Sequence, residues 1–380
     1  MKIRSITYKQ FKGLDNEWSV KDFELGKINL IVGKNGSGKS KTISLIHSLS
    51  VILGDLNKIP FIEGAYDVTF QDIDSNDIFY YKLEYSDAII INEVLKKNKE
   101  FLVKRNYKGI GVIKSNKAGN IDFKIPSDEI VLNRRDEIQY PYLERFNYWA
   151  KHLRRFLFNT PMGKSNLGVY DKLGLKEIDY NFKETEKTID AFRKGLRNHG
   201  DKFKNSIIKD FKSIGYNISD IDIGELQSII INSDNPSIQI VGLRIKEKDL
   251  KCMTDQNEMS TGMFRALSII IHMNYYELER IPGCILIDDI GEGLDFDRST
   301  RLIQLLIKKT ENTKLDIQLI MTTNDRFVMN NVDLKYWQII DRKGSNVRYF
   351  NLRNSPDVFE NFKFTGLNNF DFFTSEYYKS

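Results

Sequence analysis

The sequence of 380 residues is poor in cysteine and histidine, and it contains no long apolar run. Its two cysteines, Cys252 and Cys284, are too few and too far apart for a disulfide framework or a zinc site. No stretch approaches the about eighteen unbroken apolar residues that suggest a membrane span. The first residues, MKIRSITYKQF, lack the apolar core and cleavage pattern of a signal peptide. These absences predict a cytoplasmic protein that does not enter a membrane.

Charge of one sign is also scarce, because 57 Lys and Arg oppose 52 Asp and Glu, a net charge of +5. The small surplus is unevenly spread, since residues 141–215 hold 16 basic and 9 acidic side chains. A local basic surplus can attract phosphate groups. It can equally be the solvated face of a helix, and both interpretations stay open.

The first part of the chain shows strand patterns with one helical stretch. Strand-like residues 2–11 and 27–32 flank a polar turn region, and a helix-like pattern then reaches about Leu53. Short alternating runs follow over residues 67–116, which predicts an antiparallel sheet region.

Near Pro141 the sequence pattern changes from strand-like alternation to helical spacing. Apolar side chains then recur at helical spacing, at Leu143, Phe146, Trp149, Leu153 and Phe156. After a break at residues 161–168, helix-like sequence continues to about residue 215. A helical insertion is therefore predicted where the basic surplus lies.

Strands and helices alternate again in the last part of the chain. We expect strands at 226–232, 238–246, 284–290 and 317–324, helices at 262–280 and 297–310, and a hairpin at 336–352. The aromatic tail at 362–373 is too apolar for a disordered end and is expected to pack on the rest of the chain. This order predicts an α/β core built from both ends of the chain, with three parts at 1–140, 141–223 and 224–380.

The sequence "GKNGSGKS" at residues 33–40 matches the phosphate-loop pattern GxxxxGK[ST]. Glycines let successive backbone N–H groups point at phosphate oxygens, and the following helix adds its positive dipole end. Lys39 would reach the β- and γ-phosphates, and the Ser40 hydroxyl would help to hold Mg²⁺. The nucleotide-binding residues predicted here are Gly33, Lys34, Asn35, Gly36, Ser37, Gly38, Lys39, Ser40 and Lys41.

The stretch "CILIDDIGEGLD", residues 284–295, places adjacent carboxylates at the end of an apolar run. Such a pair at the mouth of a buried strand is costly without a cation. Asp288 is the predicted Mg²⁺ residue, and Asp289 or Glu292 would orient and deprotonate the attacking water. The alternative is an acidic turn that caps the helix starting near Asp297.

Between these two motifs, Ser260, Thr261 and Gly262 precede a helix-like stretch in "EMSTGMFRALSI". Taken alone, this is an ordinary helix N-cap. A Ser-x-Gly at a helix start can also form a second anion site.

In this order, "GKNGSGKS", "MSTGMFRALS", "ILIDDIGEGLD" and "LIMTTND" resemble the ABC-type ATPases of the SMC, RecF and OLD group. They are similar in particular to the AAA-family ATP-binding proteins of bacterial anti-phage loci. The resemblance covers residues 1–55 and about 255–330. It implies a P-loop NTPase head with a mixed sheet core, an antiparallel β subdomain and a helical insertion.

The resemblance also implies how the residues would act. In this class, two heads enclose two ATP molecules, and the signature of one subunit contacts the γ-phosphate held by the other. Ser260 and Gly262 would then act across the dimer, and Arg265 would couple that contact to motion. Asp288 would be the Walker B carboxylate and Asp295 the D-loop aspartate at the dimer seam.

Two positions depart from the pattern of the class. Asp289 stands where glutamate is usual, and Asn324 stands where a histidine is usual and cannot titrate. Both departures imply slow hydrolysis or a water placed differently, for example by Glu292. The glutamine that usually contacts Mg²⁺ has no assignment, and Gln71 and Gln139 are only candidates.

The chain has no Cys-x-x-Cys hook, no long heptad arms and no nuclease-like histidine cluster. Any nuclease or toxin activity would therefore belong to a partner effector. The resemblance implies an ATPase that forms a homodimer or a larger assembly of dimers. It also implies a role as sensor or scaffold in anti-phage defence. Nucleic acid is a further candidate partner at the basic insertion. A RecF-like DNA repair ATPase, a nucleotide-dependent scaffold with little turnover and an ABC transporter subunit are the alternatives.

Overall fold

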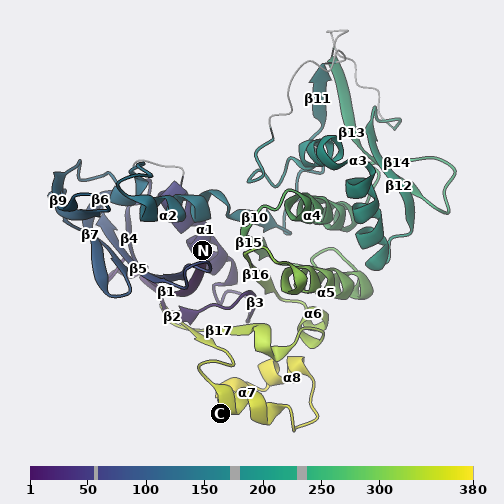
Figure 1. Cartoon of the computed structure of the whole chain (residues 1–380). Helices are drawn as coiled ribbons and strands as arrows, with labels where there is room; N and C mark the ends of the chain where they lie inside the picture. The colour runs from purple at the N-terminus through teal and green to yellow at the C-terminus, as the bar shows by residue number, and fades with distance from the viewer. Residues whose placement is uncertain (55–58, 172–179, 229–237, 380) are drawn as a thin grey trace.

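The computed structural model describes residues 1–54, 59–171, 180–228 and 238–379. Figure 1 shows an antiparallel β region on one side and a helical region with its own sheet on the other, joined by the central strands. The C-terminal helices lie below the central strands in this view. Within the described residues, no helix has the length and apolar character needed to cross a membrane.

One large mixed sheet organises the described part of the chain. Its 14 strands follow the order β10-β15-β16-β3-β17-β18-β2-β1-β4-β5-β6-β7-β8-β9. The strands are β1 (Lys2–Gln10), β2 (Trp18–Glu24), β3 (Ile28–Val32), β4 (Glu63–Gln71), β5 (Ile78–Ser86), β6 (Ile89–Lys97), β7 (Glu100–Asn106), β8 (Ile110–Ser115), β9 (Gly119–Lys124), β10 (Arg154–Leu157), β15 (Gly283–Asp288), β16 (Ile317–Thr323), β17 (Trp337–Lys343) and β18 (Asn346–Phe350).

The parallel part of this sheet comes from distant segments of the chain. β15 pairs with β10 and β16, and β3 pairs with β16 and β17, all in parallel. Every residue of β3, β15 and β16 is buried. Strands covered on both faces require continuous apolar runs, which is why these segments stand out in the sequence. Because the strands are parallel, their carboxyl ends meet at one edge.

The antiparallel part alternates between buried and half-exposed side chains, as β4 and β5 do along their whole length. Its buried face packs with helices α1 (Lys39–Gly54) and α2 (Pro141–Lys151) in one apolar core. The remaining helices are α3 (Thr188–Ser213), α4 (Thr261–Leu278), α5 (Phe296–Asn312), α6 (Arg326–Asn330), α7 (Pro356–Phe362) and α8 (Asn369–Thr374), with 3₁₀ turns η1 (Val131–Asn133), η2 (Leu334–Tyr336) and η3 (Tyr377–Lys379).

A second, smaller sheet lies beside α3 and α4. It contains β11 (Gly168–Asp171), β12 (Ile218–Gly224), β13 (Ile238–Glu247) and the short β14 (Thr254–Asp255). α3 is interrupted at Gly200, whose φ of +53° is not helical. Glycine tolerates this backbone conformation, so the break falls where the sequence allows it.

Several local predictions were wrong. Residues 154–157, including Phe156, form β10 of the main sheet rather than a continuation of α2. The predicted polar turn before residue 27 contains β2, and the part predicted as helical contains β11 and β12. Residues 172–179 of the predicted insertion and 229–232 of the predicted strand lie outside the described residues. The divisions at residues 140 and 223 stay a prediction.

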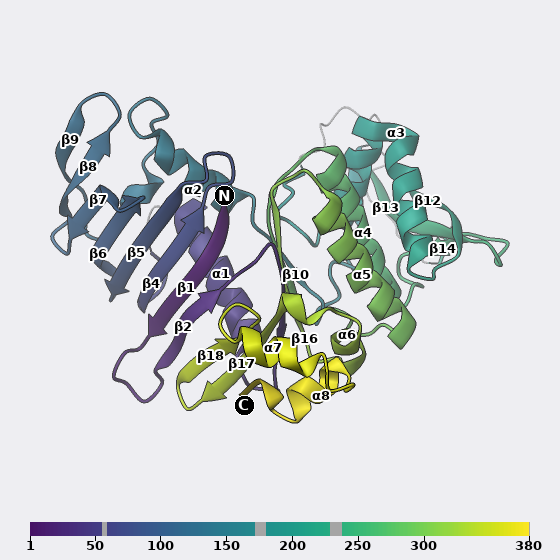
Figure 2. The same cartoon turned by 60° about the horizontal axis from the view of Figure 1, so that its bottom comes forward.

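The aromatic tail packs on the rest of the chain, as predicted. Phe359, Phe362, Phe372 and Phe373 are all buried in the core cluster shared with α4, β15 and β16. Figure 2 shows α7 and α8 beside α6 and the hairpin of β17 and β18. The tail is therefore part of the fold rather than an appendage.

A buried polar cluster joins β10 to α4. His272 is fully buried, and its Nδ1 lies 2.8 Å from the Tyr180 hydroxyl oxygen and 3.3 Å from that of Tyr276. The Arg154 guanidinium lies over the ring of Tyr276, 4.2 Å from its centroid. Burial lowers the pKa of His272 from 6.5 to about 3, and the positive charge of Arg154 acts in the same direction.

This depressed pKa predicts a loss of stability in acid. Below pH 6.5, the unfolded chain binds a proton at His272 that the folded chain does not bind, so the free energy of unfolding falls as the pH drops. The slope from this group is about 1.4 kcal/mol per pH unit. We expect the variant His272→Gln to lose about 1 kcal/mol less than the wild type between pH 7 and 5.5 in urea titrations. His199→Gln, a change at a half-exposed histidine beside Glu279, should keep the full loss, and equal losses in wild type and His272→Gln would contradict this account.

Candidate functional site

The loop at residues 33–40 joins the carboxyl end of β3 to the start of α1. Gly36 and Gly38 have φ values of +75° and +106°, which other residues rarely adopt. The Lys39 ammonium curls back over the loop, donating hydrogen bonds to the carbonyls of Gly33 at 2.8 Å and Lys34 at 3.2 Å. The backbone therefore makes a tight turn between β3 and α1, and its binding of phosphate stays a prediction.

The acidic motif meets this loop although 248 residues separate the two in the sequence. Asp288 is the last residue of β15, and only 1% of it is exposed. Its Oδ1 accepts hydrogen bonds from the Ser40 hydroxyl at 3.1 Å and the Thr322 hydroxyl at 2.7 Å. Because β15 runs parallel to β16 and β16 to β3, all three carboxyl ends bring their polar residues to one edge.

Asp289 has an unusual backbone and an unusual environment. Its φ is +55°, and its N–H donates to the Thr322 hydroxyl at 2.8 Å. Its Oδ1 is buried and has no hydrogen-bond partner among the described residues. Burial raises the pKa of Asp289, and the neighbouring Asp288 and Glu292 carboxylates raise it further. Strained residues with unpaired buried oxygens are concentrated at functional sites.

Opposite charges face each other across the site. Burial lowers the pKa of Lys39, which is 6% exposed, while the carboxylates of Asp289 and Asp288 oppose that shift. The Ser37 hydroxyl is also buried without a partner among the described residues. One ammonium, two carboxylates and a free hydroxyl therefore converge on the curled backbone.

The predicted signature residues lie at the start of α4. Ser260 is its N-cap, because its side chain accepts a hydrogen bond from the Met263 N–H. Gly262 packs so closely on the Gly293 carbonyl that an added Cβ would lie 2.0 Å from that oxygen. In the described residues, no hydrogen bond or ion pair joins Ser260 or Gly262 to the phosphate loop.

Arg265 ties α4 to the acidic loop. Its guanidinium donates to the carbonyls of Thr160 at 2.8 Å and Glu292 at 3.0 Å. The Glu292 side chain itself is exposed. A shift of the acidic loop would therefore reach the start of α4 directly.

The two remaining sequence candidates are exposed. Asp295 caps α5, accepting from the Arg298 N–H at 3.0 Å, and its carboxylate pairs with the Arg298 guanidinium at 2.8 Å. This local role is the alternative that the sequence left open. Asn324 directly follows β16, next to the carboxyl end that carries Thr322.

Several neighbours of the site were not identified from the sequence. Thr322 lies within the motif LIMTTND, and its hydroxyl at the end of a buried strand was a usable signal. Arg155 donates to the Ser44 hydroxyl at 3.0 Å and interacts electrostatically with the Asp288 carboxylate. It was not identified because its segment was wrongly predicted to be helical. Arg342 donates to the Gly36 carbonyl at 3.3 Å, and Lys34 pairs with Glu376 at 2.8 Å.

Neither glutamine candidate lies beside the acidic motif in the sheet. Gln71 ends β4 and hydrogen-bonds to Asn76, while the Gln139 N–H donates to Asp136. The strand next to β15 is β10, and the N–H of the following Phe158 donates to the Asp288 carbonyl at 3.0 Å. The exposed residue that comes next is an asparagine at position 159 rather than a glutamine.

Comparison with known proteins finds similarity in structure but not in sequence. No protein-family model matches the chain, and no curated protein matches it significantly. The SMC head bound to the C-terminal winged-helix domain of ScpA is 14% identical with a TM-score of 0.51, over 94% of this chain and 100% of that one. The Pyrococcus furiosus Smc head with an extended coiled coil, also bound to ScpA, is 13% identical with a TM-score of 0.51, over 95% and 99%.

A third similar structure, the SMC head domain from Thermotoga maritima, is 12% identical with a TM-score of 0.47, over 92% of this chain and 99% of that one. The first two comparisons show that the mixed α/β fold is that of SMC head domains. The predicted fold class is confirmed at this level.

Proposed function

We propose that this chain is an ATPase that holds ATP and Mg²⁺ between the phosphate loop and Asp288 and that closes into a dimer around the nucleotide. The observation that carries the proposal is the hydrogen bond from Ser40 to Asp288, with Lys39 facing the same carboxylate. A glycine loop at a helix start, an ammonium, a hydroxyl and a strand-end carboxylate are parts that phosphoryl transfer uses. The SMC-head fold supports the same class of activity.

The side chains present fit a magnesium–triphosphate. In the described residues, no group of three or more His, Cys, Asp or Glu side chains could hold a metal ion. A cation at this site would therefore rely on the Asp288 carboxylate, the Ser40 hydroxyl and the phosphates themselves. Mg²⁺ is commonly bound in this way, through few protein ligands plus substrate oxygens, and it neutralises charge that develops on the transferred phosphoryl group.

Each residue near the phosphates has a distinct task in this proposal. Lys39 leaves the loop carbonyls and balances phosphate charge. Ser40 and Thr322 hold the Asp288 carboxylate in place through the same oxygen. Asp289 is suited to accept a proton from the attacking water, because its pKa is raised and its Oδ1 is unpaired. Glu292 is the alternative base, with an exposed side chain on the same loop.

The remaining candidate residues have proposed roles at the interface of the dimer. Ser260 is exposed at the start of α4, whereas Gly262 is buried against the Gly293 carbonyl. Within the described residues, neither has a bond to the phosphate loop of its own subunit, and the exposure of Ser260 supports contact with the partner subunit's nucleotide. Asp295 and Asn324 are exposed at the edge that would face the partner. We further propose, from the resemblance in sequence, a sensor or scaffold role in anti-phage defence beside a separate nuclease or toxin. Nucleic acid at the basic insertion stays a prediction.

ATP should therefore change the assembly state. In sedimentation velocity, we expect a shift toward a dimer with ATP and Mg²⁺, clearest in Asp289→Asn, where slowed hydrolysis lets the closed state accumulate. Moving the population from 1:99 to 99:1 requires ATP to favour the dimer by about 5.5 kcal/mol. Lys39→Ala serves as the control that keeps the fold and removes the phosphate contact. If ATP neither binds nor alters sedimentation, the proposed function is wrong.

A further inference from the structure

A cavity of about 1030 Å³ lies at the edge of the main sheet opposite the phosphate loop. Lys27, Gly283 and Asp316 line it, and they stand at the amino ends of β3, β15 and β16. The carboxyl ends of the same strands carry the phosphate loop, Asp288 and Thr322. The cavity is therefore separate from the proposed ATP site.

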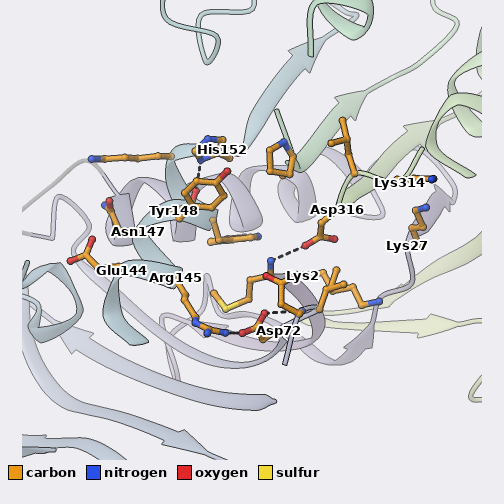
Figure 3. A pocket seen from close by; sticks show the side chains of 18 of the residues that line it. Lys2, Lys27, Asp72, Glu144, Arg145, Asn147, Tyr148, His152, Lys314 and Asp316 are labelled. Atoms are coloured by element: carbon orange, nitrogen blue, oxygen red, sulfur yellow. Dashed lines mark hydrogen bonds and ion pairs between the residues drawn. The ribbon is translucent and has the colours of Figure 1, made fainter. Parts of the chain in front are cut away.

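One face of α2 forms a wall of this cavity. Glu144, Tyr148 and Lys151 recur at helical spacing on α2 and line the cavity together with His152, which directly follows the helix. Figure 3 shows Glu144, Tyr148 and His152 along this wall. The Arg145 side chain of this helix contacts Asp72, a carboxylate that is 4% exposed, although Arg145 itself is exposed. This half-buried ion pair joins the wall to the residues that follow β4.

Two buried polar atoms in the lining have no partner among the described residues. Trp149 is 2% exposed, and its Nε1–H donates to none of the described groups. The Glu144 Oε1 is likewise buried without a hydrogen bond. Buried polar atoms are normally paired, so these two are exceptions in the wall of the cavity. The second carboxylate oxygen of Glu144 lies 4.0 Å from the Arg135 guanidinium.

Charges of both signs line the cavity, and the unpaired ones are mostly positive. Within the described part of the chain, Lys2, Lys27, Lys151 and Lys314 form no ion pair, although Lys27 donates to the Glu311 carbonyl at 3.5 Å. The lining also contains the carboxylates of Asp72, Asp74, Glu137, Glu144 and Asp316, of which Asp72, Glu144 and Asp316 face Arg145, Arg135 and the N-terminal ammonium. Burial lowers the pKa of His152, and the positive charges of Arg154, Lys183 and Lys151 lower it further. Unpaired ammonium groups in a concave, partly enclosed site attract anions.

The cavity lining also contains an exposed aromatic ring. The Tyr148 ring is stacked on His152, with 3.8 Å between centroids and 26° between planes, although 51% of Tyr148 is exposed. Figure 3 shows Tyr148 and His152 between Lys27 and Lys314 on one side and Glu144 on the other. An exposed ring between cationic groups and a carboxylate matches a ligand with a phosphate at one end and a planar ring with N–H donors beyond it.

We propose that this cavity binds a nucleotide, with its phosphate at Lys27 and Lys314, its base on Tyr148 and the N–H edge of the base at Glu144. Carboxylates accept hydrogen bonds from base amino groups, and aromatic side chains stack on any base. The volume exceeds that of most small-molecule sites, which hold about 300–1000 Å³. The same chemistry is offered by a free mononucleotide and by the 5′-phosphate end of a single strand.

The test uses the full chain carrying Lys39→Ala, so that the phosphate loop contributes little binding. Equilibrium dialysis with GMP, AMP and inorganic phosphate should show one saturable nucleotide site per chain. Tyr148→Ala should weaken binding by about tenfold, the loss typical of one base stack. Lys27→Glu should weaken it at least as much, and Lys308→Glu, the same change at an exposed lysine outside the cavity, should leave it unchanged.

A 5′-phosphorylated pentanucleotide distinguishes the two sources. Tighter binding than GMP assigns a single-strand end, and equal or weaker binding assigns a free nucleotide. The proposal is overturned if no nucleotide saturates the site, if Tyr148→Ala and Lys27→Glu both leave binding intact, or if phosphate alone binds as well as GMP. In the otherwise wild-type chain, neither cavity variant should change ATP hydrolysis, so this result and a failure of the proposed ATPase are distinguishable.

Discussion

Replacing Asp288 with asparagine should reduce the rate of ATP hydrolysis by about 100-fold or more, because the change removes the buried carboxylate that we propose to face Mg²⁺ at the end of β15. Asparagine keeps an oxygen that can accept from Ser40 and Thr322, so the loop and strand should keep their positions. Turnover is measured as released phosphate under saturating ATP and Mg²⁺. Lys39→Ala should cause a loss of similar size by removing the ammonium that faces the phosphates.

The matched control for this experiment is Asp297→Asn, the same chemical change on an exposed carboxylate of α5. It should leave turnover within about twofold of the wild type, as most exposed surface substitutions do. Circular dichroism and the urea midpoint show whether each variant is folded. Equal rates in wild type, Asp288→Asn and Lys39→Ala would end the ATPase proposal and favour a scaffold or a contaminating activity.

Replacing Ser260 with arginine should abolish ATP hydrolysis but leave ATP binding by the single subunit nearly intact. Ser260 lies at the start of α4 and has no bond to the phosphate loop of its own chain, so its contribution would be made across the dimer. We expect turnover to fall by about 100-fold or more, in line with the loss of one preorganised donor near the phosphates. The lost N-cap costs only about 1 kcal/mol, which the whole domain can tolerate.

Mixing two inactive variants tests this assignment more sharply. In an equimolar mixture of Lys39→Ala and Ser260→Arg, half of the dimers carry one subunit of each kind, and each of these has one intact composite site. Activity should therefore return to about a quarter of the wild-type level in a twofold-symmetric dimer. Ser260→Thr, which keeps a capping hydroxyl, should retain activity without mixing. Full activity in Ser260→Arg, or no recovery on mixing, would contradict action across the dimer.

The motifs could be identified from the sequence because their signals are local. The phosphate loop is defined by glycines within eight residues, and Asp288 follows a run of apolar residues that only a fully buried strand explains. Their meeting could be expected because both lie at the ends of parallel strands. The likeness to SMC head domains agrees with the fold that the resemblance of the four motifs implies.

Other parts of the site could not be predicted, because their signals were ambiguous. Phe156 follows Leu153 by three residues, a spacing that fits a helix and also a short buried strand, and only the pairing of β10 with β15 decides between them. That error hid Arg155, which lies near Asp288. The same error hid Asn159, which lies two residues after the end of β10. The two glutamines considered for Mg²⁺ contact, Gln71 and Gln139, lie elsewhere in the fold.

By itself, the sequence predicted the groups on which the proposed chemistry rests: a glycine turn with Lys39 and Ser40, a strand-end aspartate, and a helix start at Ser260. Glycines, hydroxyls and carboxylates at fixed spacing have few other uses, so their types and order were enough. Only the tertiary structure decided which groups share one edge of the sheet and which share the other. Lys27, Tyr148 and Lys314 lie far apart in the sequence, without a common motif, and they form one cavity because strand order and the packing of α2 bring them together.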